Sequence, residues 1–418
     1  MNHSLTRRGF LRIAGMSGVA LLGTREAMSQ TPGPAARPAD AAPPAAVSVP
    51  VAPRLDPKPI PTRSLGRTGV NIPILSLGGM FDTRSAQLYL RQTLAWGVSA
   101  WDTADCYENG NSEEGYGRYF QRNPDDRAKV FLTSKSDEHE PKGMANLLQQ
   151  SLKRLNTTYI DLYLLHGIKT ADALTPEVRD WAKSMKAAGS IRHFGFSTHR
   201  NMEGLLGNAA SLGWIDVVLT SVNYRLLNNR KMLSALDACQ KAGVGIIGMK
   251  FKGGGPIHPS PEAEERLAAA FVGRGFTLDQ AMLKALWEHP AIASVCASMT
   301  NFGTMQEYVA AAFDRKTLEA GEFDALRRHA LETRGSFCQA CGACDAATQG
   351  APVADAMRCL MYENAYGDGR RAREAFRSIP QDLRTRLVRN DWSAVQRCCP
   401  NGLPLGQLIA DAVERFGV

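Results

Sequence analysis

The chain has 418 residues, of which 44% are hydrophobic and 22% are charged. This composition is typical of a globular protein, and the length is enough for a barrel of about 250 residues with further segments attached. The formal net charge is +8, but the lysines and arginines are not gathered on one element, as a nucleic-acid-binding surface requires. We therefore exclude nucleic acid as a partner.

The N-terminal residues have the pattern of a targeting segment. Residues 6–11 are Thr-Arg-Arg-Gly-Phe-Leu, followed by an apolar stretch at 13–22 and small residues near 27–29. This pattern predicts a secretory signal over residues 1–29, and its apolar stretch is well short of the ~20 residues that span a bilayer. The arginine pair resembles a twin-arginine signal, with an ordinary secretory signal as the alternative. The resemblance implies that the twin-arginine translocase exports a folded, cofactor-loaded protein to the periplasm.

Residues 30–60 are rich in proline and alanine. Such a segment cannot bury enough apolar surface to fold, so we predict an extended linker. The rest of the chain divides into a predicted barrel, residues 61–325, and a cysteine-rich extension, residues 326–418.

From residue 72 onward, short apolar runs alternate with amphipathic segments. The alternation favours parallel β/α units, and eight such strands predict an α/β fold, a (β/α)8 TIM barrel, with a doubly wound sheet as the alternative. Gly97, Gly189, Gly213 and Gly243 mark helix ends. The predicted strands are residues 74–77, 100–102, 130–133, 160–165, 193–196, 217–222, 245–249 and 292–297, and the predicted helices include 86–96, 144–155, 177–188 and 230–242.

Ionisable side chains follow three neighbouring strands of this predicted barrel. Asp102 ends the second strand and Tyr107 follows it, Lys135 closes the third, and His166 follows the fourth. Strand ends of a β/α barrel meet at one face, where the chemistry of such barrels takes place. We therefore expect these four side chains to converge at the barrel mouth.

The segments around these residues resemble the aldo-keto reductase family. The similarity covers roughly residues 61–315, and the matching segments keep the family's order and spacing. It implies an NAD(P)-dependent oxidoreductase that interconverts a small carbonyl compound and an alcohol, a sugar being one candidate substrate. The matching segments are Leu-Gly-Arg-Thr-Gly at 65–69, Asp-Thr-Ala-x-x-Tyr at 102–107, Ser-Leu-Lys-Arg-Leu at 151–155, Tyr-Ile-Asp-Leu-Tyr-Leu-Leu-His at 159–166 and Ala-Gly-Val-Gly-Ile-Ile-Gly-Met-Lys at 242–250.

The resemblance implies a catalytic tetrad. Tyr107 is the general acid, because reduction of a carbonyl needs a proton on its oxygen. A phenol has an ordinary pKa of about 10, and a neighbouring ammonium from Lys135 is expected to lower it. Asp102 is expected to hold Lys135 charged, and His166 to orient the substrate oxygen.

The resemblance also implies residues that contact the nicotinamide nucleotide. Gly253 opens a run of three glycines that permits close approach of the backbone to phosphates. No lysine or arginine lies at 297–307, where the family commonly places a cation for the 2′-phosphate of NADP, so NAD and NADP both stay open. The candidate cofactor-binding residues are Gly79, Ser197, Thr198, Ser221, Met249, Lys250, Gly253, Ser298 and Glu307.

Cysteines gather in the last part of the chain. Cys338, Cys341 and Cys344 match the first three positions of a bacterial ferredoxin run, whereas the fourth position is Thr348. Cys399 precedes a proline, as does the last cysteine of the second ferredoxin run. That last cysteine joins the first three of the other run around one cluster. The resemblance therefore implies a single [4Fe–4S] cluster held by Cys338, Cys341, Cys344 and Cys399.

Several alternatives stay open for these cysteines. Cys398 or Cys359 could replace Cys399 as the fourth ligand, and structural zinc or disulfides are rival uses of the same thiols. A cluster could relay electrons to a redox partner or simply brace the extension. The competing function is a periplasmic iron–sulfur electron-transfer or binding protein whose barrel does not catalyse.

Overall fold

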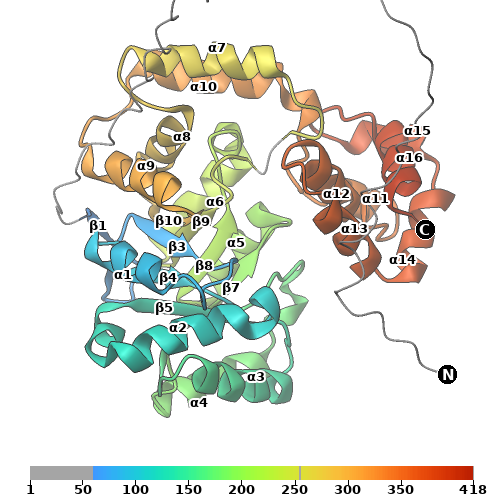
Figure 1. Cartoon of the computed structure of the whole chain (residues 1–418). Coiled ribbons are helices and arrows are strands. Elements are labelled where there is room, and N and C mark those ends of the chain that lie inside the picture. Colours follow the sequence, from blue (N-terminus) through green and yellow to red (C-terminus); the bar gives the residue numbers. More distant parts are fainter. Residues whose placement is uncertain (1–59, 254–255, 418) are drawn as a thin grey trace, which may run out of the picture. The chain divides into compact units, whose positions relative to one another are not determined.

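A computed structural model describes residues 60–253 and 256–417. At its centre, eight parallel strands close into a barrel in the order β10-β3-β4-β5-β6-β7-β8-β9 (Figure 1). The predicted TIM barrel is therefore confirmed, and β4, β6 and β9 have the bounds expected from the sequence. The barrel strands are β3 (Leu75–Gly78), β4 (Ala100–Asp102), β5 (Phe131–Ser136), β6 (Ile160–Leu165), β7 (Ile191–Thr198), β8 (Val217–Ser221), β9 (Gly245–Met249) and β10 (Ile292–Ser298).

Helices connect the strands and surround the barrel (Figure 1). Gly97, Gly189, Gly213 and Gly243, which the sequence placed at helix ends, all have positive φ, a conformation that glycine adopts without steric cost. The helices of this part are α1 (Gln87–Ala95), α2 (Asn111–Arg122), α3 (Pro141–Arg154), α4 (Pro176–Ala187), α5 (Met202–Leu212), α6 (Arg230–Lys241), α7 (Pro261–Val272), α8 (Leu278–Trp287), α9 (Phe302–Phe313) and α10 (Ala320–Glu332).

The barrel interior is apolar except at one end. An antiparallel hairpin, β1 (Thr62–Ser64) and β2 (Asn71–Pro73), brings Leu65 and Ile72 against the interior side chains. Its turn lies against the start of β9, since an added Cβ at Gly66 would be 2.4 Å from the Gly243 carbonyl. The hairpin thus covers the N-terminal ends of the strands and leaves the opposite rim for polar side chains. The interior side chains are Leu162, Leu164, Val217, Leu219, Ile247 and Ala293.

The C-terminal region is helical and has its own apolar core. Leu360, Phe376, Leu408 and Phe416 lie in this core, and Ile257, from the loop after β9, packs into it. Helix α10 runs continuously through residues 325 and 326, so the boundary expected there falls inside a helix. The helices of the extension are α11 (Ala343–Ala347), α12 (Val353–Asn364), α13 (Gly369–Ser378), α14 (Gln381–Arg389), α15 (Trp392–Val395) and α16 (Leu405–Phe416).

The described residues of the barrel and of the extension, 60–253 and 256–417, belong to one compact unit. The predicted signal peptide, residues 1–29, and nearly all of the predicted linker, residues 30–60, lie outside the described residues. Within 60–253 and 256–417, no helix combines the length and the apolarity that crossing a membrane requires.

Candidate active site

Three of the four predicted catalytic residues form one hydrogen-bonded cluster. Lys135, at the end of β5, is buried with 1% of its surface exposed. Its Nζ donates to Asp102 Oδ1 at 2.7 Å, to the Thr103 carbonyl at 2.6 Å and to the Tyr107 hydroxyl at 3.3 Å. Adjacent parallel strands set this contact, because Asp102 pairs with Thr133 in the ladder, two residues before Lys135. The structure therefore brings the acid, the amine and the phenol together, as the sequence predicts.

Burial and charge act against each other in this cluster. Burial raises the pKa of Tyr107 above its ordinary value, and Lys135 opposes that rise without reversing it. The expected net lowering of the Tyr107 pKa is therefore absent, because desolvation of the phenolate is the larger effect. Burial lowers the pKa of Lys135, but Asp102 and Tyr107 together raise it above its ordinary value.

Asp102 and Lys135 are assigned as an ion pair. Burial raises the pKa of Asp102, and Lys135 acts to lower it. A protonated Asp102 would leave the buried Lys135 ammonium without a counter-ion, which is costly in a site removed from water. The charged pair also satisfies two of the three ammonium donors on Asp102 and the Thr103 carbonyl.

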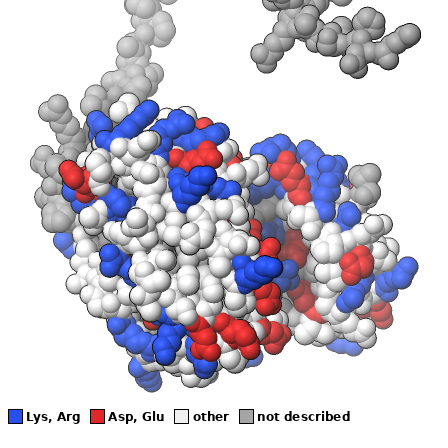
Figure 2. Space-filling model, turned by 90° about the horizontal axis from the view of Figure 1, so that it is seen from below, with Lys and Arg blue, Asp and Glu red and all other residues white. Residues whose placement is uncertain are grey.

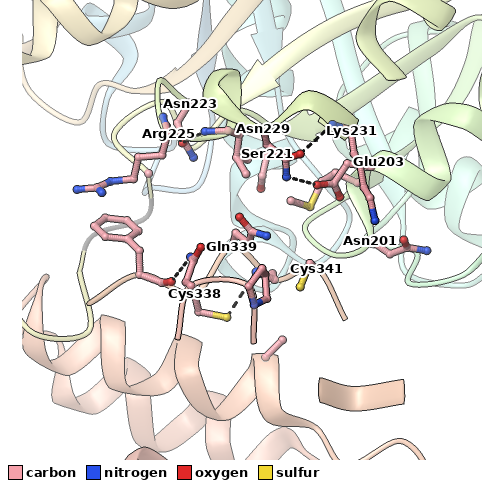
Figure 3. A pocket seen from close by; sticks show the side chains of 18 of the residues that line it. Asn201, Glu203, Ser221, Asn223, Arg225, Asn229, Lys231, Cys338, Gln339 and Cys341 are labelled. Atoms are coloured by element: carbon pink, nitrogen blue, oxygen red, sulfur yellow. Dashed lines mark hydrogen bonds between the residues drawn. The ribbon is translucent and has the colours of Figure 1, made fainter. Parts of the chain in front are cut away.

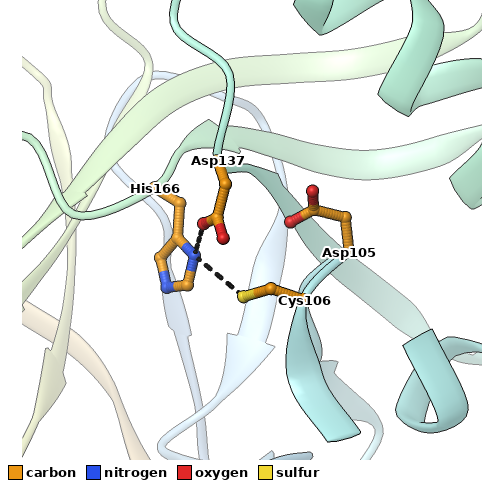
Figure 4. Close-up of side chains that lie close together, drawn as sticks. All are labelled: Asp105, Cys106, Asp137 and His166. Carbon is orange, nitrogen blue, oxygen red and sulfur yellow. Dashed lines mark hydrogen bonds and ion pairs between the residues drawn. The ribbon is translucent and has the colours of Figure 1, made fainter. Parts of the chain in front are cut away.

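The fourth predicted residue, His166, follows β6 on the same rim. Its ring centroid is 5.6 Å from that of Tyr107 in an edge arrangement. Its Nδ1 is 2.5 Å from Asp137 Oδ1, and its other ring nitrogen points away from this contact (Figure 4). His166 acts on the pKa of Asp137, which lies below its ordinary value although burial raises it. The sequence analysis did not identify Asp137 as a site residue. Its position two residues after Lys135, on the same strand end, was the signal that could have pointed to it.

Several predicted cofactor-binding residues have structural contacts on the rim. Ser197 Oγ accepts from Gly167 N, and Thr198 Oγ1 lies 2.9 Å from the Ile168 carbonyl and 2.8 Å from the Arg200 carbonyl, so both hydroxyls hold loops. Their proposed contact with a nucleotide stays a prediction.

The remaining predicted cofactor residues near β3, β9 and β10 are distributed around the rim. Gly79 packs tightly, since an added Cβ would lie 2.3 Å from the Asp102 carbonyl. Ser298 is exposed at the end of β10, and Met249 packs against the apolar barrel interior. Glu307 accepts a hydrogen bond from Thr277 on the outer helices.

A large cleft lies between the loops that follow β7, β8 and β9 and the cysteine-rich extension. Its volume is about 1220 Å³, and it includes the predicted residues Ser221, Lys250 and Gly253. Figure 3 shows Ser221 and Arg225 on the barrel side and Cys338 and Cys341 on the side of the extension. Figure 2 shows a hollow between barrel and extension with acidic and basic side chains at its edges. Among the described lining residues Glu203 alone is acidic, whereas the basic ones are Arg225, Arg230, Lys231, Lys250, Arg334 and Arg358. The cleft therefore favours an anionic ligand.

Two half-buried bases lie in the cleft wall. Burial, with Arg358 and Arg371 nearby, lowers the pKa of Lys250 to about 8. His199, which the sequence analysis missed, follows Thr198 and has its Nδ1 2.9 Å from the Ser221 hydroxyl. Burial lowers the pKa of His199 well below its ordinary value, so this ring is neutral near pH 7.

Part of the cleft wall comes from contacts between barrel and extension. Arg225 stacks on the Phe337 ring with its guanidinium carbon 3.6 Å from the centroid. Its Nε is buried and has no hydrogen-bond partner. Gly253 has φ +89°, and an added Cβ there would lie 3.0 Å from Phe337. The two neighbouring glycines, 254 and 255, lie outside the described residues.

The four predicted cluster cysteines line one small apolar cavity in the extension. Cys338, Cys341, Cys344 and Cys399 all border it. The Ala340 amide donates to Cys338 Sγ and the Leu403 amide donates to Cys399 Sγ, both at 3.4 Å. Two positive-φ residues, Ala340 and Gly342, turn the loop that carries the first three cysteines.

The positions of the cysteine sulfurs bear on whether these thiols form disulfides, bind zinc or hold a cluster. No disulfide links the described cysteines. Among the described residues, no three cysteine sulfurs lie within 4.8 Å of one another, whereas zinc–sulfur bonds of ~2.3 Å in a tetrahedron bring all four closer than that. Cys359 is buried in the helical core away from the cavity, and Cys398 is exposed on the large cleft. The arrangement therefore favours Cys399 over both as the fourth residue.

One arginine joins the cysteine loop to the barrel. Arg200, just after β7, forms ion pairs with Asp345 at 2.8 Å and with Asp355. Asp345 Oδ1 also accepts from the Val353 and Ala354 amides at the start of α12. A backbone hydrogen bond of 3.1 Å from Asn201 to Ala340 lies beside these pairs. These contacts fix the cysteine loop against the rim.

The fold and the rim cluster define a TIM-barrel protein with an acid–base group at the C-terminal ends of its strands. The sequence profile of the aldo/keto reductase family matches residues 74–327, and the chain belongs to this family of oxidoreductases.

Two relatives agree with this assignment, and one solved structure is similar in fold. The uncharacterized oxidoreductase YqkF of Bacillus subtilis (strain 168) is 26% identical over 302 residues, 64% of this chain and 95% of that protein. The aldo-keto reductase yakc [NADP(+)] of Schizosaccharomyces pombe is 26% identical over 209 residues, 45% of this chain and 60% of that protein. The holo form of aldo-keto reductase AKR11C1 from Bacillus halodurans superposes with a TM-score of 0.55 and 22% identity, covering 65% of this chain and 96% of that one. This last likeness supports the fold.

Proposed function

We propose that this chain is an exported oxidoreductase that interconverts a small carbonyl compound and an alcohol by hydride exchange with a nicotinamide nucleotide. The observation that carries the proposal is the buried Lys135 held between Asp102 Oδ1 and the Tyr107 hydroxyl. A buried ammonium placed against a phenol stabilises the phenolate, the state that remains after the phenol gives up its proton.

Tyr107 is the proton donor in the reducing direction. Its hydroxyl gives its proton to the carbonyl oxygen, and the Lys135 ammonium stabilises the phenolate left behind. In the oxidising direction the same phenolate takes the proton back from the alcohol. Asp102 keeps Lys135 charged and in place throughout. His166 orients the substrate oxygen with the ring nitrogen that does not face Asp137.

The large cleft is the proposed site of the nucleotide. When bound, the nucleotide supplies or accepts the hydride. Residues Arg225 and Lys250 would hold its phosphates, because both are half-buried basic side chains in the cleft wall. The similar fission-yeast protein is named for NADP(+), and the cations of this cleft supply charges for a 2′-phosphate that residues 297–307 lack. We therefore propose NADP as the preferred form.

The cysteine cavity is the proposed site of a [4Fe–4S] cluster. Four cysteines around one apolar cavity fit a cluster that holds its thiolates several ångströms apart. The two amide donors on Cys338 and Cys399 sulfurs are of the kind that tune such clusters. Cys338 and Cys341 also border the large cleft, so the cluster would lie beside the nucleotide site and could exchange single electrons with a redox partner.

Export is proposed from the leader alone. The Arg-Arg-Gly-Phe-Leu segment at 7–11 supports the twin-arginine route to the periplasm. Because this route carries folded proteins, both cofactors would be loaded before export. A reporter fused after residue 60 and followed by cell fractionation tests the route, with Arg7→Lys/Arg8→Lys as the variant expected to stay in the cytoplasm.

Anaerobic purification of the mature chain tests the enzyme assignment. Denaturation should release a nicotinamide nucleotide identified by mass, and iron and sulfide should be present in equal amounts. The Tyr107→Phe variant should keep the nucleotide and lose carbonyl turnover by ~10²–10⁴-fold. A chain that carries iron and sulfide but neither binds nucleotide nor turns over would instead be an electron-transfer or binding protein.

A further inference from the structure

A second cluster of ligating side chains lies on the rim beside the tetrad. Asp105 and Cys106 come from the loop after β4, Asp137 follows β5 and His166 follows β6 (Figure 4). One ligand atom of each of the four residues lies within 4.8 Å of those of the other three. Among the described residues this is the one group of its kind.

The contacts inside this cluster are incomplete. His166 Nδ1 faces both Asp137 Oδ1, at 2.5 Å, and Cys106 Sγ, at 3.6 Å. Asp105 is 8% exposed, and its Oδ1 is buried without a hydrogen-bond partner. A buried carboxylate oxygen without a partner is costly unless something positive or hydrogen-bonding reaches it. Backbone groups of Cys106 and Asp137 hydrogen-bond to the Asp105 carboxylate, but its Oδ1 is left without a partner.

We propose that Asp105, Cys106, Asp137 and His166 bind a divalent cation of the zinc type at this rim. One sulfur, one imidazole nitrogen and two carboxylate oxygens are all ligands that Zn²⁺ accepts in a tetrahedral site. Calcium and magnesium take oxygen ligands, so the thiol and the imidazole argue against them. On binding, the Cys106 thiol releases its proton to solvent and a zinc–sulfur bond forms, with no change of oxidation state.

The cation would change which nitrogen of His166 carries the proton. While Asp137 is ionised it can only accept, so Nδ1 of the neutral ring donates to it and the other nitrogen is left as an acceptor. A cation on Nδ1 moves the proton to the other nitrogen, which then donates. If the proposed function holds, His166 with the cation bound donates a hydrogen bond and so favours a carbonyl substrate. Without the cation the same nitrogen accepts a hydrogen bond and so favours an alcohol.

Zinc binding by the full, anaerobically purified chain tests the site. Titration against a chromophoric chelator should give one zinc per chain. Cys106→Ser and Asp105→Asn should each weaken its affinity by at least ~100-fold, because even groups that only support a ligand contribute 10–100-fold. Cys398→Ser, which changes the other exposed cysteine, should bind zinc as the native chain does. Equal affinity in the native chain and Cys106→Ser would overturn the proposal.

X-ray absorption of the zinc-loaded chain separates this site from the cysteine cavity. One sulfur and three lighter ligands per zinc support the rim site. Four sulfurs would place the zinc among Cys338, Cys341, Cys344 and Cys399 and overturn it. Both measurements are independent of turnover, so a chain that lacks carbonyl activity but binds zinc through one sulfur would contradict the proposed function and leave the metal site standing.

Discussion

Replacing Lys135 with methionine should destabilise the fold in a way that depends on pH. The substitution keeps the length of the side chain but removes the counter-ion of Asp102, whose side chain is 10% exposed. Breaking a buried pair by removing one partner costs about 3–5 kcal/mol. The carboxylate can escape this cost by taking up a proton, which for an ordinary aspartate costs about 4 kcal/mol at pH 7 and about 2 kcal/mol at pH 5.5.

The sign follows from the proton uptake. In Lys135→Met the folded-state pKa of Asp102 lies above its unfolded value, so the folded state binds the extra proton. The free energy of unfolding of this variant should therefore be closest to that of the native chain at low pH. The difference between the two should grow as the pH rises. Denaturant unfolding followed by circular dichroism at several pH values measures the difference from the native chain.

A double variant separates stability from catalysis. Lys135→Met/Asp102→Asn leaves no unpaired charge, so its stability should recover most of the loss and its pH dependence should flatten. Its carbonyl turnover should remain ~10²–10⁴-fold below that of the native chain, because the phenol has lost its ammonium neighbour. Lys129→Met removes a lysine from an exposed pair with Asp126 and should change neither property. Native turnover in the double variant, or a pH-independent loss in the single one, would refute the reasoning.

Three further predictions concern the extension and the cleft. Arg200→Met should lower the free energy of unfolding by about 2–3 kcal/mol and speed the loss of iron, because it breaks two partly buried ion pairs. The control Arg179→Met changes an exposed ion pair and should have neither effect. NADP⁺ affinity, measured by fluorescence titration, should fall as the pH rises above about 8, where Lys250 loses its charge. In Lys250→Met the affinity should be weaker and should not change with pH. A native pH profile in that variant would show that Lys250 does not contact the nucleotide. Cys399→Ser should lose the visible cluster absorbance and Cys359→Ser should keep it; the reverse would assign Cys359 as the ligand.

The barrel and its rim could be predicted because their signals are local. Each strand is a short apolar run that ends at a polar rim, and the order of Asp102, Tyr107, Lys135 and His166 along the chain matches the order of the strands. Ladder pairing between neighbouring strands then determines their convergence, so the sequence pattern was sufficient to place the tetrad.

The cleft and the effect of burial could not be predicted in this way. Arg200 meets Asp345 across 145 positions, and Arg225 stacks on Phe337; no local pattern shows such contacts between barrel and extension. Residues 297–307 contain no lysine or arginine, whereas the basic residues of the cleft lie on the loops after β8 and β9 and in the extension, among other places. The direction of the Tyr107 pKa depends on how fully the phenol is buried, which sequence spacing does not give.

Transfer of a labelled hydride tests the central claim most directly. The native chain is mixed with an aldehyde and with NADPH in which both hydrogens on the nicotinamide C4 are replaced by deuterium, and the alcohol is examined by mass spectrometry. Deuterium should appear on the former carbonyl carbon, at a rate that falls by ~10²–10⁴-fold in Tyr107→Phe. An unlabelled product, or an equal rate in the native chain and in Tyr107→Phe, would contradict the account.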